Sequence, residues 1–309
     1  MGKYKFGVVG IGPSGAILAA HLADHGEDVA IVDIKYDHMT AIREHGLHLT
    51  GEADLIVRFK KTHTSISMLK QYEIDVLFIA TKTFSLRPVL HEIRDIYHDG
   101  MKIVCYQNGV DNEDMIAERF SPEAALRVVI NHAGNVVDDG VVRMTFFHKP
   151  NYIGCLSKES EKITKDVAKI LTAAELDTEY APDIKFREWE KAIFHTALAP
   201  VSALTGQTMK EAMSLPETRE LVDALLREAI AVAEARGIDL GEGFYEKGIR
   251  YLGTAGDHKP SMRVDIEEGS ETEIDFITGK IIEHAEKTEA GCPINLALYN
   301  LVKGMEMKL

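Results

Sequence analysis

The start of the chain alternates between unbroken apolar runs and one segment that has an apolar and a polar face. A run at residues 6–9 leads through GIGPSG (residues 10–15) into this amphipathic segment, and a second run at 29–32 ends on Asp33. Short continuous apolar runs are typical of strands buried on both faces, whereas a spacing of three to four residues is typical of a helix. The pattern therefore predicts a strand, a glycine turn, a helix and a second strand.

Strand and helix patterns continue to alternate in the next part of the chain. Four segments carry such a pattern, of which the first fits either a strand or an excursion: 55–59, 74–80, 86–97 and 102–106. Strands that alternate with helices predict a doubly wound parallel sheet, which binds ligands at the carboxyl ends of its strands. Lys82 and Asn108 both come just past such ends.

A β-rich stretch at 126–156 joins apolar runs through turns, and Asp139-Gly140 is a hairpin signal. We expect this stretch to extend the same sheet with antiparallel strands. A helical pattern at 159–174 and a short strand after it complete a first domain of residues 1–182.

Strand patterns end at about residue 183. Five segments with helical spacing follow: 187–204, 217–236, 241–252, 273–288 and 294–307. We therefore expect an α/β fold with an N-terminal Rossmann-type dinucleotide-binding domain, followed by an all-α C-terminal domain at 183–309.

The composition is that of an ordinary globular protein and limits the classes of partner. Of the 309 residues 45% are hydrophobic, and no apolar run reaches the ~18 residues that a membrane-spanning helix needs. We expect a cytoplasmic protein, because the N-terminus enters a strand without a signal-peptide pattern. The net charge of −14 argues against nucleic acid and anionic membranes as partners. Three separated cysteines without a Cys/His cluster predict no metal site.

The glycine turn matches the pattern of a dinucleotide-binding loop. Gly10 lets the chain turn, Gly12 lets the backbone approach a pyrophosphate, and Gly15 lets the helix pack on the strand. Free N–H groups and the dipole at the helix start then hold the phosphates. Asp33 follows at the interval of about 20 residues expected for an acid that binds the ribose. These residues predict that the chain binds a dinucleotide.

Two polar segments in the second half of the chain have simple explanations when each is taken alone. In the first helix of the second domain, Lys191, His195 and Ser202 share one face, and Pro200 interrupts the helix. Residues 260–275 are polar and turn-rich before a helix, where acids favour the helix dipole. A solvated lysine and a helix-start acid would account for these two segments.

Taken together, the motifs of the chain resemble the ketopantoate reductase family. They are the glycine motif, TK at 81–82, QNG at 107–109, Lys191 with a proline nine residues later, and Ser261 with Glu273 twelve residues later in TEIDFITG. The resemblance covers essentially the whole chain. It implies a Rossmann domain followed by a helical domain, and the reduction of a 2-oxo acid with a nicotinamide cofactor.

The resemblance also implies a role for each matching residue. Lys191 matches the catalytic lysine that protonates the carbonyl oxygen, and Glu273 matches the catalytic acid that orients this region and contacts the cofactor or the forming hydroxyl. Ser261 matches a ligand of the substrate carboxylate, and Asn108 matches a contact of both substrate and cofactor. The residues expected to contact the cofactor are Gly10, Gly12, Pro13, Ser14, Gly15, Asp33, Lys82, Asn108, Gly134 and Glu273.

His195 and Ala199 depart from the family pattern, in which both positions are asparagines that bind substrate. His195 can still bind a substrate hydroxyl, or it can be a core histidine. Ala199 cannot hydrogen-bond through its side chain. The departures leave room for a 2-oxo acid with a branched or bulkier tail.

The end of the second strand bears on the choice of cofactor. Asp33 can accept a hydrogen bond from a ribose 2′-OH but repels a 2′-phosphate, and Ile34 stands where NADP-using relatives carry an arginine. Lys35 is a counter-argument, because its charge can attract a phosphate. We expect NAD(H) to be preferred, with NADP(H) as the alternative.

The expected function is NAD(H)-dependent reduction of 2-dehydropantoate, or of a similar branched 2-oxo acid, to the D-2-hydroxy acid. One alternative is a D-2-hydroxy acid dehydrogenase for bulkier side chains. Another is a sensor that binds a dinucleotide without turnover, although a sensor needs neither Lys191 nor Glu273. The long second-domain helices can bury apolar faces within one chain or against a second copy, so the sequence allows either a monomer or a homodimer.

Overall fold

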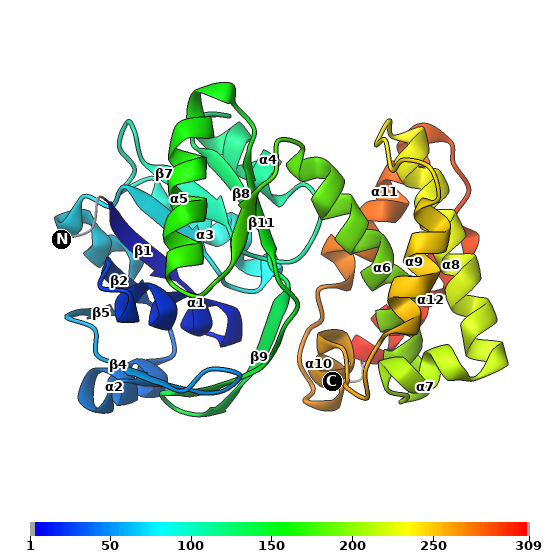
Figure 1. Cartoon of the computed structure of the whole chain (residues 1–309), viewed down its shortest axis with the longest axis horizontal. Helices are drawn as coiled ribbons and strands as arrows, with labels where there is room; N and C mark the ends of the chain where they lie inside the picture. The colour runs from blue at the N-terminus through cyan, green and yellow to red at the C-terminus, as the bar shows by residue number, and fades with distance from the viewer. Residues whose placement is uncertain (1–3, 308–309) are drawn as a thin grey trace. The chain divides into compact units, whose positions relative to one another are not determined.

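A computed structural model describes residues 4–307 of the chain (Figure 1). The chain folds as two compact units. The first, the α/β unit, comprises Met1–Gln107 and Asp111–Ile184, and the second, the helical unit, comprises Asn108–Val110 and Lys185–Leu309. The division after Ile184 lies two residues beyond the expected boundary, and the sequence did not predict that Asn108–Val110 belongs to the helical unit.

The α/β unit is built on an eight-stranded sheet. Its order is β12-β11-β8-β7-β6-β1-β2-β5, in which neighbours from β8 to β5 are parallel and β11 is antiparallel to β8. The order runs outward from β1 in both directions, as in a doubly wound sheet. The strands are β1 (Lys5–Val9), β2 (Asp28–Val32), β5 (Lys61–His63), β6 (Val76–Ile79), β7 (Lys102–Cys105), β8 (Ala125–Val129), β11 (Asn151–Cys155) and β12 (Thr178–Tyr180).

Alternate residues of the central strands pack into separate cores on the two faces of this sheet. Val8 and Phe78 belong to the core that includes residues of α1 and α5, and Val9 and Ile79 belong to the core that includes residues of α3. Because both faces are covered, these strands appear in the sequence as unbroken apolar runs. The helices of the unit are α1 (Pro13–Asp24), α2 (Tyr36–His45), α3 (Leu86–Ile93), α4 (Asn112–Arg119) and α5 (Glu161–Ala173), with 3-10 turns η1 (Ile66–Tyr72), η2 (Thr83–Ser85) and η3 (Lys158–Ser160).

The hairpin predicted at Asp139-Gly140 is confirmed, but it is not part of the large sheet. β9 (His132–Asp138) and β10 (Val141–Phe147) join β3 (Leu47–Gly51) and β4 (Leu55–Val57) in a four-stranded sheet, where β10 is parallel to β3. The expected antiparallel extension is therefore correct for β11 and wrong for the hairpin. The reason is that β7 and β11 already pair with both edges of β8.

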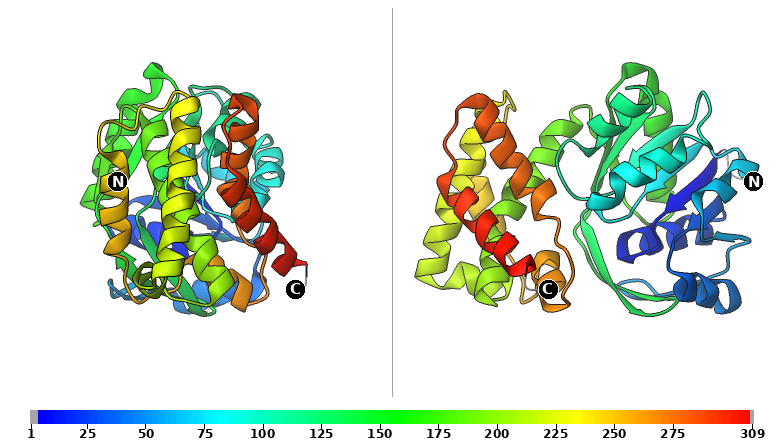
Figure 2. Two further views of the ribbon diagram at one scale, coloured as in Figure 1. Left: turned by 90° about the vertical axis from the view of Figure 1, so that its right-hand side faces the viewer. Right: turned by 180° about the vertical axis from the view of Figure 1, so that it is seen from behind.

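The helical unit contains no strand among residues 185–307. Its helices are α6 (Ile184–Thr205), α7 (Met209–Ser214), α8 (Pro216–Ala235), α9 (Phe244–Gly253), α10 (Ser261–Glu267), α11 (Thr278–Thr288) and α12 (Pro293–Glu306), with a 3-10 turn η4 (Ile274–Phe276). Within the unit, α8 packs against α7, α9, α11 and α12 (Figure 2). α7 and α10 were not predicted, whereas the α/β domain followed by an all-α domain is confirmed.

Between residues 4 and 307, none of the helices combines the length and the apolar character that crossing a membrane requires.

Candidate active site

The glycine loop at the end of β1 is tightly packed at two of its three glycines. Gly10 has a φ of +92°, and a Cβ on it would lie 2.6 Å from the backbone nitrogen of Thr81. A Cβ on Gly15 would lie 1.8 Å from the carbonyl oxygen of Gly10. A Cβ on Gly12 would have no atom within 4 Å. Gly10 and Gly15 therefore allow the turn and the approach of helix to strand, while the space beside Gly12 is open to a ligand.

Asp33 joins the end of β2 to this loop. Its Oδ2 accepts a hydrogen bond from the Ile11 N–H at 2.7 Å, and its Oδ1 accepts one from the Lys35 N–H at 2.8 Å. A carboxylate has about four lone-pair sites, so two backbone bonds leave capacity for a hydroxyl. The neighbouring Ile34 side chain is 88% exposed.

The other residues expected to contact the cofactor occupy different places in the α/β unit. Pro13 and Ser14 begin α1. Lys82 precedes η2, and its carbonyl oxygen accepts a hydrogen bond from Gln107 Nε2 at 3.3 Å. Gly134 lies on β9, where a Cβ would come within 2.6 Å of a carbonyl oxygen of β10. Close packing of the hairpin thus explains Gly134 without a ligand.

Three of the predicted site residues are linked by hydrogen bonds in the helical unit. Lys191 on α6 donates from Nζ to the Oδ1 of Asn108 at 2.8 Å. The amide nitrogen of Asn108 donates in turn to the Oε2 of Glu273 at 3.4 Å. We call Lys191, Asn108 and Glu273 the polar triad. It places an ammonium donor and a carboxylate on the two ends of one amide, which is a suitable arrangement for holding and delivering a proton.

The segment that carries Asn108 is held by the helical unit itself. The Val110 N–H donates to the carbonyl oxygen of Phe276 at 2.9 Å, and the Val110 side chain is fully buried in the core of this unit. This anchoring explains why Asn108–Val110 belongs to the helical unit.

Residues on α12 hold the segment that carries Glu273. The Oε1 of Glu306 accepts from the N–H of Thr272 at 2.9 Å and from its hydroxyl at 2.6 Å. On the other side of Glu273, Asp275 accepts from Tyr299 at 2.6 Å and from Lys303 at 2.8 Å. Glu273 is 8% exposed, so its backbone is fixed on both sides in a buried position.

The pKa values of two of these α12 residues reflect the same contacts. Burial, with the hydrogen bond to Asp275, raises the pKa of Tyr299 to about 12. Burial opposes the charge of Lys303, but its hydrogen bonds to Asp275 and Glu306 hold its pKa above the usual value. Both side chains therefore remain donors to Asp275 at neutral pH.

The remaining substrate candidates lie on α6 and α10. His195 is half-buried, one turn after Lys191, and Ser261 is exposed as the first residue of α10. Ala199, one further turn along α6, is buried in an apolar cluster with Met262 and Ile274. These two partners adjoin Ser261 and Glu273 in the sequence, so the surroundings of the Ala199 side chain are apolar.

The sequence assigned no role to three residues that support these sites, although Gln107 and Thr272 belong to the quoted motifs QNG and TEIDFITG. Gln107 is buried at the end of β7, where its Nε2 donates to the Thr81 carbonyl oxygen at 2.9 Å. Its position after a parallel strand was a usable signal. Thr272 and Glu306 are 34 positions apart, and no local pattern connects them.

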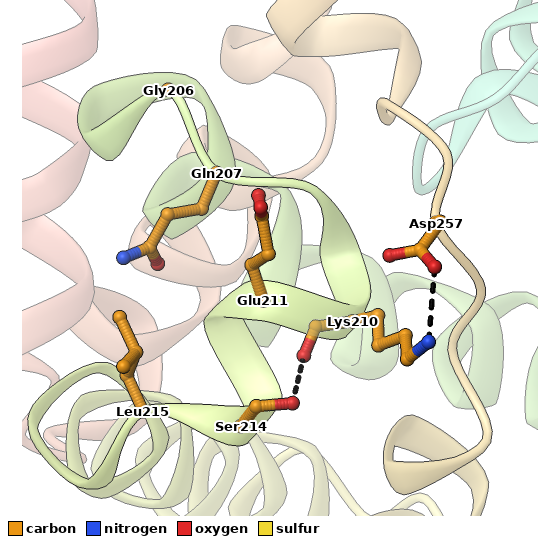
Figure 3. A pocket seen from close by; sticks show the side chains of 7 residues that line it. All are labelled: Gly206, Gln207, Lys210, Glu211, Ser214, Leu215 and Asp257. Atoms are coloured by element: carbon orange, nitrogen blue, oxygen red, sulfur yellow. Dashed lines mark hydrogen bonds and ion pairs between the residues drawn. The ribbon is translucent and has the colours of Figure 1, made fainter.

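A separate hollow on the helical unit lies beside α7 (Figure 3). Lys210 and Asp257 form an ion pair across it at 3.0 Å, and the Ser214 hydroxyl bonds to the Lys210 carbonyl oxygen. None of the predicted site residues lines this hollow. In the described range 4–307, no group of three or more His, Cys, Asp or Glu side chains is placed to hold a metal ion.

Two family models match the chain along most of its length. The model described as "Ketopantoate reductase PanE/ApbA" matches residues 6–158, and "Ketopantoate reductase PanE/ApbA C terminal" matches 183–306. The chain belongs to the ketopantoate reductase family. Among curated members of this family, a 2-dehydropantoate 2-reductase of Pyrococcus abyssi is 30% identical over 302 residues, which cover 98% of each chain. One from Archaeoglobus fulgidus is 26% identical, again over 98% of each chain.

Solved structures share the fold over the whole chain. A D-mandelate dehydrogenase with NADH and anilino(oxo)acetate has a TM-score of 0.90 at 23% identity and covers 98% of both chains. A 2-dehydropantoate 2-reductase from Geobacter metallireducens has a TM-score of 0.89 at 24% identity, covering 97% of this chain and 99% of the other. A dimeric ketopantoate reductase from Staphylococcus aureus has a TM-score of 0.80 at 20% identity, covering 98% and 99%.

Proposed function

We propose that this protein is an NAD(H)-dependent oxidoreductase that reduces a 2-oxo acid to the D-2-hydroxy acid. The observation that carries the proposal is the polar triad of Lys191, Asn108 and Glu273. Membership of the ketopantoate reductase family supports it, as does the name shared by the curated relatives. The domain roles follow: residues 1–182 bind the dinucleotide, and residues 183–309, with Asn108, bind substrate and carry catalysis.

Lys191 is the proposed proton donor. When bound, the nicotinamide cofactor supplies a hydride to the carbonyl carbon of the substrate. Negative charge then develops on the carbonyl oxygen, which the Lys191 ammonium stabilises before its proton completes the hydroxyl. Asn108 holds Nζ in place by accepting its hydrogen bond, and Glu273 holds Asn108 by accepting from its amide nitrogen. We assign a substrate contact to Asn108, His195 and Ser261.

The α/β unit suits a dinucleotide, with a preference for NAD(H). The open space beside Gly12 and the capacity left on Asp33 fit a pyrophosphate and a ribose 2′-OH. The Asp33 carboxylate would repel a 2′-phosphate, and the adjacent Ile34 offers no charge to bind one. Lys35 is the residue that would admit NADP(H).

The substrate tail is proposed to be branched and apolar near Ala199. Ala199 lies in a buried apolar cluster with Met262 and Ile274, which offers no hydrogen bond to a hydroxyl on the substrate tail. The proposed substrates are 2-dehydropantoate, whose tail hydroxyl would have no partner at Ala199, and similar branched 2-oxo acids that lack this hydroxyl. The second candidate function is dehydrogenation of D-2-hydroxy acids with bulkier side chains, which the D-mandelate dehydrogenase likeness supports.

The test is oxidation of NADH and NADPH with 2-dehydropantoate, 2-oxoisovalerate and phenylglyoxylate. We expect a higher kcat/KM with NADH than with NADPH. The order of kcat/KM among the three oxo acids distinguishes the two candidate functions. A clear preference for NADPH would contradict the cofactor assignment. NADH binding without oxidation of any substrate would favour a sensor.

Lys191→Ala is expected to lose about 10²- to 10⁴-fold in kcat while still binding NADH, because the ammonium acts only on the reacting oxygen. Lys191→Arg keeps the charge but not a transferable proton, so it should also be impaired. Lys165→Ala on α5, which removes an exposed ion pair with Glu161, is the matched control with normal turnover. Normal turnover in Lys191→Ala would exclude it as the acid.

The assembly is proposed to be a homodimer, as the Staphylococcus aureus protein is described. Light scattering on the purified chain tests this, and a monomeric mass would contradict it. The net charge of −14 supports the absence of a nucleic-acid partner.

A further inference from the structure

We propose that His38 is a positioning residue of the dinucleotide loop, because it fixes the direction in which the Gly12 N–H points. The inference rests on the proposed function, since it assumes that a dinucleotide binds at this loop.

The hydrogen bonds of His38 determine its tautomer. His38 lies on α2 and is 2% exposed. Its Nδ1 accepts the backbone N–H of Gly140 at 3.1 Å, and its Nε2 lies 3.0 Å from the carbonyl oxygen of Ile11. An N–H can only donate, so Nδ1 carries no proton. The neutral ring therefore carries its proton on Nε2 and donates it to Ile11.

The bond to Ile11 sets the orientation of the next peptide group. The Ile11 carbonyl and the Gly12 N–H belong to one planar trans peptide, so they point in opposite directions. Holding the carbonyl on His38 turns the Gly12 N–H to the other side of the chain. The preceding peptide is fixed as well, because the Ile11 N–H donates to Asp33 at 2.7 Å. Both peptide groups of Ile11 are thus held by side chains from outside the loop.

The Gly12 N–H matters more here than in a loop without proline. Pro13 begins α1 and has no N–H, so it cannot donate to a phosphate. Gly12 and Ser14 are the residues on either side of it that can. A change in the direction of one of these donors therefore affects a large part of the phosphate contacts.

The β9–β10 turn of the four-stranded sheet packs against α2 and contacts His38. Gly140 lies in the β9–β10 turn with a φ of +75°, and a Cβ on it would lie 3.2 Å from the Cβ of Ala41 on α2. Asp139 Oδ1 lies 3.8 Å from His38 Nδ1, beyond hydrogen-bond distance, so the partner of this nitrogen is the Gly140 N–H. The hairpin that departs from the large sheet thus supplies the N–H donor of Gly140, which fixes the imidazole.

Two substitutions test the two ring nitrogens of His38 separately. His38→Asn places an amide oxygen near the position of Nδ1 and keeps an acceptor for Gly140, but its amide cannot reach Ile11. His38→Gln places an amide nitrogen near the position of Nε2 and keeps the donor to Ile11. We expect His38→Asn to bind NADH about tenfold more weakly than wild type. We expect His38→Gln to stay within about threefold of wild type.

The readouts are the Kd for NADH from fluorescence titration, and kcat at saturating NADH, which should change little because His38 touches no reacting atom. His21→Gln is the matched control: it removes another buried histidine bond to a carbonyl oxygen, that of Ala174 at 2.9 Å. Its Kd should equal that of wild type. Equal Kd values for the two His38 variants, or a weaker His38→Gln, would overturn the inference.

A second measurement does not depend on how the variants fold. ¹⁵N-histidine spectra of the wild-type protein should show His38 as the neutral Nε2–H tautomer, and an Nδ1–H tautomer would overturn the inference. Failure of the wild-type chain to bind NADH would instead contradict the proposed function, and this inference with it. Equal Kd values for NADH in wild type and His38→Asn would contradict the role of His38 but not the proposed function.

Discussion

Asn108 shows how much one residue type can do in this site. Its amide oxygen accepts from the Lys191 ammonium, and its amide nitrogen donates to the Glu273 carboxylate. An aspartate has no donor when ionised, and a hydroxyl cannot span both partners with separate atoms. An amide joins a cation to an anion without adding a charge of its own.

At the residue scale, the buried His21 makes stability depend on pH. Burial is the largest influence and lowers the pKa of His21 below its usual value of 6.5, in spite of a hydrogen bond to Ala174. As pH falls below that value the unfolded chain gains a proton that the folded chain does not yet bind. The contribution of His21 to the free energy of unfolding is therefore fully present above about pH 6.5. It is lost as the pH falls toward the lower pKa of His21 in the folded state.

The comparison is with His21→Asn, which does not titrate and can still donate to the Ala174 carbonyl oxygen. The free energy of unfolding in urea, measured at about pH 7.5 and about pH 5.5, should fall more in wild type than in His21→Asn. Equal losses in the two proteins would show that His21 does not contribute.

At the scale of elements, α12 is expected to support catalysis without contributing a reacting group. Glu306 holds the N–H and hydroxyl of Thr272, the residue before Glu273. In Glu306→Ala the buried Thr272 donors lose their acceptor, and the Glu273 carboxylate is no longer held in position. We expect kcat/KM for the oxo acid to fall about tenfold.

The matched control for Glu306→Ala is Glu283→Ala on α11. Glu283 pairs with Lys280 and Lys287 at a side-chain exposure of 41%, so its removal should change activity little. A kcat/KM in Glu306→Ala equal to that of the control would show that α12 does not position Glu273.

The elements also show what the sequence could and could not predict. The alternation of apolar runs predicted the parallel sheet, because strands covered on both faces leave an unmistakable pattern. The β9–β10 hairpin was recognised as two strands. A period of two does not determine which strand is the pairing partner, so the prediction that the hairpin extends the large sheet was wrong. α7 begins with a capping box of Thr208 and Glu211, a local signal that was available but not used.

Lys191 and Glu273 were predicted as site residues because they match a family motif, and the structure shows that both are hydrogen-bonded to Asn108. It was not predictable where long-range packing decides. His38 lay in a polar stretch without any distinguishing spacing, and its bonds to Ile11 and Gly140 span 27 and 102 positions.

At the scale of the whole molecule, the net charge of −14 acts against an anionic substrate and an anionic cofactor. Added salt screens this repulsion, since the Debye length falls from about 30 Å at 0.01 M to about 8 Å at 0.15 M. We expect kcat/KM for the oxo acid to rise about twofold over this range. A steep fall would mean that local cations, rather than the net charge, govern association.

The short segment Asn108–Val110 has a consequence for how such a protein can be recombined. The chain passes from one unit to the other after Gln107, returns after Val110, and passes again after Ile184. A chimera joined only near residue 184 would receive Lys191 and Glu273 from one parent and the amide between them from the other. We therefore expect that an exchange of substrate specificity between relatives requires residues 108–110 to be exchanged together with the rest of the helical unit.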